Sequence, residues 1–199
     1  MNYELAAEVA RLAQRYGEPL QVAARLPGRQ FSPVSETDRV GEVCMVVRRR
    51  DGRLLTAIKT FYPDGAHRLL TGGIHHGESI EAALLRETWE ETGLDVAVRR
   101  FLAVISYRQD GTDDHGPADF LTFAFLLDET GGTLGPQDPH ERLAGYREVA
   151  LDELPAVAAR LDALADDHNH EIGGRWSEWG RFRAVVHRVV WQAMAQASV

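Results

Sequence analysis

The chain has 199 residues, of which 44% are hydrophobic, and its formal net charge is −8. This length and composition predict one globular domain with extensions, large enough to bury a core without disulfides or metal staples. Its 22 Lys and Arg residues are scattered along the sequence. A long nucleic acid is therefore not expected as a partner, because counterion-release binding needs a clustered basic surface.

Cysteine use and the N-terminal residues bear on location. Cys44 is the single cysteine, which excludes an intramolecular disulfide or a cysteine-based zinc cage and is typical of a reducing compartment. The first residues contain no apolar core of a signal peptide, and no apolar run approaches the ~18 residues of a membrane span. We expect a cytoplasmic protein with no membrane partner.

The N-terminal segment predicts an extension. Residues 3–16 place their apolar side chains on one helical stripe before Gly17, which is typical of an amphipathic helix with a glycine C-cap. Residues 26–38 are rich in Pro, Gly and Ser and are interpreted as a loop or crossing segment. Residues 1–38 are therefore expected to form an N-terminal helical extension ahead of a main domain over residues 39–199.

Short β-rich runs follow this extension. Residues 40–50 and 53–60 are joined by Asp51-Gly52, a dipeptide that predicts a hairpin. Another short run lies at residues 67–70. Later runs are predicted as strands and lie at residues 95–108, 118–128 and 146–154.

Three helices are predicted after the first β-rich runs. One extends from Ile80 to Thr92 and ends at Gly93, and a second lies near residues 154–165. The C-terminal helix follows a polar linker, and its apolar stripe consists of Phe182, Val185, Val186, Val189, Val190, Ala193 and Met194. Strands around one central helix, with helices after them, indicate an α/β or α+β sandwich.

The central helix carries an unusual concentration of acidic residues. Glu87, Glu90 and Glu91 stand at i, i+3 and i+4, so their side chains fall within about 100° of one another on the helix. Like charges at this spacing repel by ~0.2–0.5 kcal/mol per pair in solvent. A solvated acidic face would account for an isolated cluster of this kind, so the flanking residues decide its meaning.

The stretch from residue 72 to residue 94, GGIHHGESIEAALLRETWEETGL, resembles the Nudix box G-x5-E-x7-R-E-U-x-E-E-x-G-U, in which U is aliphatic. The matching identities are Gly72, Glu78, Arg86, Glu87, Glu90, Glu91 and Gly93. Thr88 departs from the pattern at the first U, and we expect its hydroxyl to bond to the carbonyl of Leu84. The resemblance implies a Nudix-type α/β/α sandwich with a mixed sheet, plus N-terminal and C-terminal helical extensions.

The resemblance also implies a metal-dependent reaction. A diphosphate carries negative charges that repel an incoming hydroxide, and Mg²⁺ or Mn²⁺ bound by hard oxygen ligands would offset that repulsion. The implied metal ligands are Glu87, Glu90, Glu91 and the backbone carbonyl of Gly72.

Two other residues of the box have supporting catalytic roles in this interpretation. Arg86 points about 100° around the helix from Glu87 and can neutralise and orient the carboxylates. Glu78 lies just ahead of the helix and is expected to steady the loop. His75 and His76 occupy free positions of the pattern; their imidazoles could contact phosphate, although solvent exposure is the favoured interpretation of both.

Polar residues outside the box could supply a general base or an extra metal ligand, or could be ordinary linkers. They are Asp113, Asp114, His115, His168, His170 and Glu171. Glu171 ranks first among them because related families sometimes place an acid in a late loop. Near the last helix, Trp176 and Trp179 could stack on a base and Arg175 could bind phosphate, although helix packing is the favoured interpretation of these three residues.

The activity that the resemblance implies is hydrolysis of a diphosphate linkage in a nucleoside diphosphate joined to another moiety, a small-molecule nucleotide substrate. No clean subgroup signature for ADP-ribose, diadenosine polyphosphates, NADH or coenzyme A identifies that moiety. One alternative is a nucleotide-sensing module without hydrolysis. Another is isoprenoid diphosphate isomerisation, which would require a reactive Cys44. Residues 1–38 and 166–199 are expected to help select the substrate or to form a homodimer.

Overall fold

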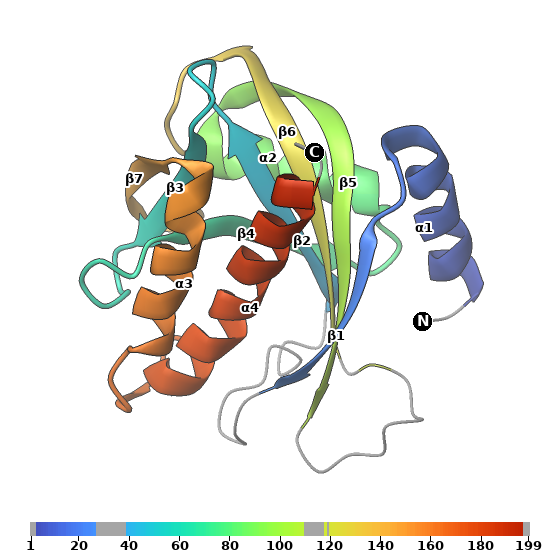
Figure 1. Ribbon diagram of the computed structural model, residues 1–199. Coiled ribbons are helices and arrows are strands. Elements are labelled where there is room, and N and C mark those ends of the chain that lie inside the picture. The colour runs from blue at the N-terminus through green and yellow to red at the C-terminus, as the bar shows by residue number, and fades with distance from the viewer. Residues whose placement is uncertain (1–2, 27–38, 110–117, 119, 197–199) are drawn as a thin grey trace.

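The computed structural model describes residues 3–26, 39–109, 118 and 120–196. Its main strands are β1 (Leu20–Leu26), β2 (Arg39–Arg48), β3 (Leu54–Lys59), β4 (Arg68–His75), β5 (Leu94–Gln109), β6 (Phe120–Gly132) and β7 (Leu143–Val149). They form one seven-stranded mixed sheet in the order β1-β5-β6-β2-β4-β3-β7. The helices are α1 (Tyr3–Tyr16), α2 (Ile80–Thr92), α3 (Leu154–Asp162) and α4 (Trp176–Ala195). Helices cover both faces of the sheet, so the predicted α/β/α sandwich is confirmed (Figure 1).

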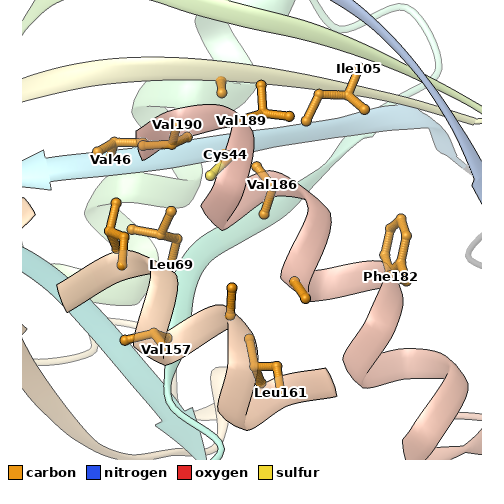
Figure 2. Packing of buried hydrophobic residues seen from close by; sticks show 14 of the residues in the cluster. Cys44, Val46, Leu69, Ile105, Val157, Leu161, Phe182, Val186, Val189 and Val190 are labelled. Atoms are coloured by element: carbon orange, nitrogen blue, oxygen red, sulfur yellow. The ribbon is translucent and has the colours of Figure 1, made fainter. Parts of the chain in front are cut away.

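Successive side chains of β2 point to opposite faces of the sheet and contribute to a separate hydrophobic core on each face. Met45 and Val47 pack in the core that contains residues of α1 and α2. Cys44 and Val46 point the other way and join the core beneath α3 and α4, where Val190 and its neighbours lie (Figure 2). Both faces are buried, which explains why the strand reads as a continuous apolar run rather than an alternating one.

The hairpin prediction is correct for the turn and wrong for most of the pairing. The turn forms at Asp51 and Gly52, where Gly52 has a φ of 90° and its N–H donates to the carbonyl of Arg49 at 2.9 Å. However, β2 and β3 pair only at Arg48 and Leu54, because β4 lies between them in the sheet. The β4 strand is antiparallel to both neighbours. Apolar runs identify strands but do not determine their partners.

The N-terminal segment is more closely joined to the sheet than the sequence indicated. The helix at residues 3–16 is confirmed as α1. The strand β1 was missed; it runs parallel to β5 at the edge of the sheet with an alternating, half-buried pattern. Helix α1 is also held to α2, since Arg15 and the hydroxyl of Tyr16 both bond to Glu81. Residues 27–38 of the predicted loop lie outside the described residues.

Later elements follow the predicted order with small differences. The structure confirms the 80–92 helix, and α4 includes the whole predicted stripe, although Val185 and Met194 are only partly buried. The predicted 146–154 strand corresponds to β7 followed by the short 3-10 helix η2 (Leu151–Glu153). Two further short strands, β8 (His168–Asn169) and β9 (Gly174–Arg175), lie in the linker before α4. No helix in the described ranges is long and apolar enough to cross a membrane.

Candidate active site

A cleft of about 400 Å³ lies where α2, the middle strands of the sheet and the segment before α4 meet. Among the described residues, its walls carry five carboxylates, Glu42, Glu87, Glu91, Glu141 and Glu171. Basic side chains from β2, β3, β4 and α4 line the same space. Charged groups of both signs are thus concentrated in one hollow of a protein whose basic residues are scattered in sequence.

Helix α2 presents the acidic residues because its two ends are fixed by local chemistry. The side chain of Ser79 caps the N-terminus by accepting the N–H of Ala82 at 3.1 Å. Gly93 ends the helix with a φ of 64°, and its N–H donates to the carbonyl of Trp89 at 2.8 Å. A left-handed residue at this position is typically glycine. Inside the helix, Thr88 Oγ1 donates to the carbonyl of Leu84 at 2.6 Å, as predicted.

Three carboxylates from two elements form a cluster. Glu87, Glu91 and Glu141 each offer an oxygen, and these oxygens lie within 4.8 Å of one another. Glu141 belongs to the short 3-10 helix η1 (Pro139–Glu141). Sequence reasoning missed Glu141, because a single glutamate in a polar loop carries no periodic or spacing signal. Only the path of the chain brings it to α2.

Glu91 is the most unusual member of this cluster. Its side chain is buried, and neither carboxylate oxygen has a hydrogen-bond partner among the described residues. Burial raises the pKa of Glu91 to about 8, although the positive charges of Arg68 and Lys59 oppose that rise. Buried carboxylates are normally paired or hydrogen-bonded. An oxygen-ligated divalent cation is a group that would satisfy this donor set.

Gly72 provides the space in which Glu87 lies. Gly72 is buried in β4 opposite Val43 of β2, and a Cβ atom built on it would overlap the carboxylate of Glu87. Burial raises the pKa of Glu87, while hydrogen bonding to Arg86 acts in the opposite direction. The glycine of the motif therefore has a steric role toward the cluster. The predicted use of its carbonyl as a metal ligand stays a prediction.

Arg86 connects the loop before α2 to the acidic face. Its guanidinium donates to both oxygens of Glu78 at 2.8 Å, to Glu87 at 2.8 Å and to Glu90 at 2.9 Å. It also donates to the carbonyl of Gly73 at 3.0 Å. These hydrogen bonds hold the pKa of Glu78 below its usual range. These contacts suit an orienting arginine and a glutamate that steadies the loop, and the catalytic roles of both residues stay predictions.

Glu90 occupies a different place from the other two acidic residues of α2. Its carboxylate accepts from Arg86, and it is not a member of the cluster that Glu87 and Glu91 form with Glu141. Its assignment as a metal ligand stays a prediction. Lys59, by contrast, contacts the cluster directly, because its Nζ lies 2.9 Å from Glu141.

The candidate substrate-binding residues near the C-terminal helix mainly contact other protein side chains. Trp176 and Trp179 are buried against Tyr62 and each other, with the Trp179 ring centroid 4.7 Å from that of Tyr62. Trp179 lines the cleft, whereas Trp176 does not. Arg175 is bonded to Asp166. Their substrate-binding role stays a prediction, and these contacts favour packing.

The other polar candidates are distributed around the site. Glu171 and His170 line the cleft, and Glu171 forms an exposed ion pair with Arg142 at 2.7 Å. His168 contacts the ring of His170. His75 and His76 are exposed, as expected. The residues Asp113, Asp114 and His115 lie outside the described part of the chain.

Cys44 is remote from this chemistry. It is fully buried on β2 in the core beneath α3 and α4, it does not line the cleft, and burial raises the pKa of its thiol. A buried thiol of this kind is an inert core group. The isomerase alternative therefore lacks the reactive cysteine that it requires.

The fold is an α/β/α sandwich, and its site is built where the acidic helix α2 packs against β4, the strand that carries Gly72. A solved structure titled as that of a UDP-X diphosphatase has the same fold, with a TM-score of 0.51 and 18% identity over 99% of this chain and 73% of its own. At that identity the likeness concerns the fold alone.

Sequence comparison identifies the family. A family model described as a NUDIX domain matches residues 38–171, and the chain belongs to the Nudix hydrolase superfamily. An NAD-capped RNA hydrolase NudC from Chromobacterium violaceum is 31% identical over 160 residues, which cover 77% of this chain and 57% of the relative. A NudC of the same description from Shigella flexneri is 40% identical over 124 residues, which cover 59% of this chain and 45% of the relative. The chain thus spans about half the length of these curated relatives.

Proposed function

We propose that the protein is a pyrophosphohydrolase that requires Mg²⁺ or Mn²⁺ and cleaves the diphosphate linkage of a nucleoside diphosphate joined to a second moiety. The observation that carries this proposal is the buried carboxylate of Glu91, which has no hydrogen-bond partner among the described residues and lies beside Glu87 and Glu141. Three neighbouring carboxylates repel one another, and although Glu87 pairs with Arg86 and Glu141 with Lys59, the oxygens of Glu91 have no hydrogen-bond partner among the described residues. A hard divalent cation is the group that this set of oxygen donors fits.

The residues of the cleft have distinct parts in this proposal. Glu87, Glu91 and Glu141 would hold the cation, together with Glu90 and the Gly72 carbonyl if the family resemblance extends to them. A bound cation supplies Lewis-acid polarisation of phosphoryl oxygens and neutralises their charge.

Basic side chains of the same site support the carboxylates and the substrate. Arg86 fixes the side chains of Glu87 and Glu90 through hydrogen bonds. Lys59 and Arg39 also line the cleft and bring positive charge to the space in which phosphate oxygens would lie.

The substrate class is proposed from the motif and the relatives together. The curated relatives are named for NAD-capped RNA. The net charge of −8 opposes binding of a long RNA by counterion release. We therefore propose small dinucleotides and nucleoside diphosphate derivatives as substrates, and the exclusion of long nucleic acid stays a prediction.

Product analysis tests this proposal. Purified protein would be incubated with Mg²⁺ or Mn²⁺ and a panel of dinucleotides, nucleotide sugars and NAD-capped RNA, and the products would be identified by mass spectrometry. We expect cleavage between the two phosphorus atoms that stops when EDTA is in excess. Undiminished activity in EDTA, with no tightly held metal left, would refute the mechanism, and binding without cleavage would support the nucleotide-sensing alternative.

A cytoplasmic location and a homodimer are also proposed. The first follows from the single buried cysteine, and the second from the helical N-terminal segment, whose β1 lies at the edge of the sheet. Sedimentation of the purified protein tests the second proposal.

A further inference from the structure

A largely buried ion pair forms part of the cleft wall. Glu42 of β2 and Arg183 of α4 both line the cleft, and their side chains are 4% and 12% exposed. Arg183 Nη1 donates to both carboxylate oxygens of Glu42, at 2.9 and 2.7 Å. Thr122 Oγ1 donates to the same carboxylate at 2.8 Å. Glu42 is thus held by three hydrogen bonds and in turn fixes the guanidinium.

Stability alone gives little reason to place an ion pair at this position. Most of the α4 surface that faces the sheet is apolar, with Phe182, Val186 and Val190 in the same core, and His187 is a buried polar residue on that surface that bonds to the backbone of Leu69. A buried ion pair is often no more stabilising than apolar side chains of similar volume, because both charges lose their hydration. Two charges in a largely apolar contact between α4 and the sheet, both lining the cleft, therefore indicate a role in that cleft.

Arg183 still has donors that no group in the described part of the chain uses. Its Nε is buried and has no hydrogen-bond partner among the described residues, and Nη2 forms no hydrogen bond with them. A guanidinium carries five N–H donors, and both donors of Nη1 are used on Glu42. The guanidinium also lies over the ring of Phe182, 4.7 Å from its centroid, which restricts its orientation. A ligand acceptor at this wall would bond to Nη2, whereas Nε is closed off from solvent.

The charge balance of the pair favours an uncharged ligand group. The Glu42 carboxylate compensates the positive charge of Arg183 at hydrogen-bond distance, so the pair offers directed N–H donors without a net charge. The adjoining wall is aromatic: Phe120 and Trp179 line the cleft, and Phe120 packs edge-on against Phe182. Donors beside aromatic rings suit a planar ring that carries a carbonyl or carboxamide acceptor.

We propose that Arg183, held by Glu42, is the specificity-determining residue for the group beyond the diphosphate, and that it selects a planar ring with an uncharged acceptor. This inference rests on the proposed diphosphate hydrolysis and deepens it. Arg183 and Glu42 are separate from the cluster of Glu87, Glu91 and Glu141. Substitutions of the pair are therefore expected to change substrate ranking more than turnover.

The first experiment compares two ligands that share one diphosphate. NAD⁺ carries a second ring with a carboxamide, and ADP-ribose lacks that ring. Arg183→Lys keeps the charge but loses the planar donors, so kcat/KM for NAD⁺ should fall about tenfold, mainly through KM, the scale of one lost hydrogen bond. The value for ADP-ribose should change less than about twofold. An equal fall for both ligands would overturn the proposal.

Arg49→Lys is the matched control. Arg49 forms a similar partly buried ion pair with Glu129 at 2.7 Å, and its Nη1 lies 3.2 Å from a carboxylate oxygen of Glu148. Arg49 does not line the cleft. Arg49→Lys should lower the melting temperature by as much as Arg183→Lys does. It should leave the ratio of kcat/KM for NAD⁺ to kcat/KM for ADP-ribose unchanged. If both variants behave alike, the Glu42–Arg183 pair is only structural and the proposal fails.

The second experiment tests the charge of the pair. Glu42→Gln would leave the positive charge of Arg183 uncompensated, so the preference should move toward a ring that carries a carboxylate. The deamido analogue of NAD⁺ differs from NAD⁺ only in this group. We expect the ratio of kcat/KM for the deamido analogue to that for NAD⁺ to rise about tenfold in the variant. A constant ratio would overturn the neutral-pair argument.

A binding measurement separates this inference from the proposed function. Analogues with a methylene group in place of the bridging oxygen of the diphosphate are not cleaved, so their Kd values in Mg²⁺ can be measured by calorimetry for each protein. Failure of the wild-type protein to hydrolyse any substrate would refute the proposed function. A Kd ratio of the two analogues that is the same in wild type and Arg183→Lys would refute the role of Arg183.

Discussion

The carboxylate of Glu87 lies in the space that a side chain at residue 72 would fill. Glu87 can therefore adopt this position only because residue 72 is glycine. The strand and the helix meet at this point, and the contact places one oxygen of Glu87 in the cluster with Glu91 and Glu141. The first glycine and a central glutamate of the motif are thus linked by direct steric contact, although fourteen residues separate them.

Gly72→Ala should displace Glu87 and disrupt the cluster. We expect kcat to fall at least ~100-fold, the scale of a lost charge-stabilising group, and stability to fall by about 1–3 kcal/mol through overpacking. Steady-state kinetics and chemical denaturation measure the two effects. Gly145→Ala is the control, because β7 leaves open space around that glycine. Near-normal turnover in Gly72→Ala would show that the position of Glu87 is unimportant.

Glu91→Gln should stabilise the metal-free protein at high pH while abolishing activity. The folded-state pKa of Glu91 is raised to about 8 by burial, above the ordinary value of 4.5. Its contribution to stability is therefore fully present below pH 4.5 and is lost as the pH rises through 8. In EDTA at pH 8 the variant should melt at a higher temperature than wild type.

Added Mg²⁺ provides the second half of that test. It should raise the melting temperature of wild type more than that of Glu91→Gln, because a ligand that binds only the folded state stabilises it. Asp152→Asn removes an exposed carboxylate and is the control. It should change neither the melting temperature in EDTA at pH 8 nor the rise in melting temperature on adding Mg²⁺. An equal Mg²⁺ response in wild type and Glu91→Gln would remove Glu91 from the metal site.

Glu141→Gln should weaken the metal site without altering α2. Glu141 contributes an oxygen to the cluster and pairs with Lys59 at 2.9 Å. We expect the Mg²⁺ concentration for half-maximal activity to rise about tenfold or more, consistent with loss of one charged ligand. Glu148→Gln, on the neighbouring β7, is the control. If the Mg²⁺ dependence is unaltered in Glu141→Gln, the cluster does not function as a unit.

His187 should make the fold sensitive to acid. Its Nε2 accepts the N–H of Leu69 at 2.9 Å, so Nδ1 carries the proton and donates to the carbonyl of Arg183 at 2.7 Å. Burial lowers the pKa of His187 to about 4. The unfolded chain therefore takes up a proton at higher pH than the folded one, and stability is complete above 6.5 and falls as the pH decreases toward 4.

Between pH 6.5 and 5 this group should cost about 2 kcal/mol in the free energy of unfolding. Urea denaturation of His187→Gln should show less stability at pH 7 but a smaller loss on acidification than wild type. His76→Gln, at an exposed position, is the control. Identical pH slopes in wild type and His187→Gln would contradict the assignment of a neutral buried imidazole.

The sequence by itself determined the features that depend on neighbours along the chain. The end of α2 followed from the glycine at 93, and the acidic face followed from helical periodicity. The back-bond of Thr88 to Leu84 and the buried thiol of Cys44 were also predictable, since each depends on one element and its immediate context. Local propensity and spacing act over a few residues and can be recognised in a single sequence.

Only the tertiary structure decided which distant residues meet. Pairing in a sheet depends on the burial of whole faces, so the position of β4 between β2 and β3 could not be inferred from apolar runs. Glu141 approaches α2, and Arg183 approaches Glu42, through contacts between elements remote in sequence. A single glutamate in a loop or a single arginine on an amphipathic helix has no pattern of its own. Its partner is selected by long-range packing, which is a property of the folded chain rather than of any short stretch.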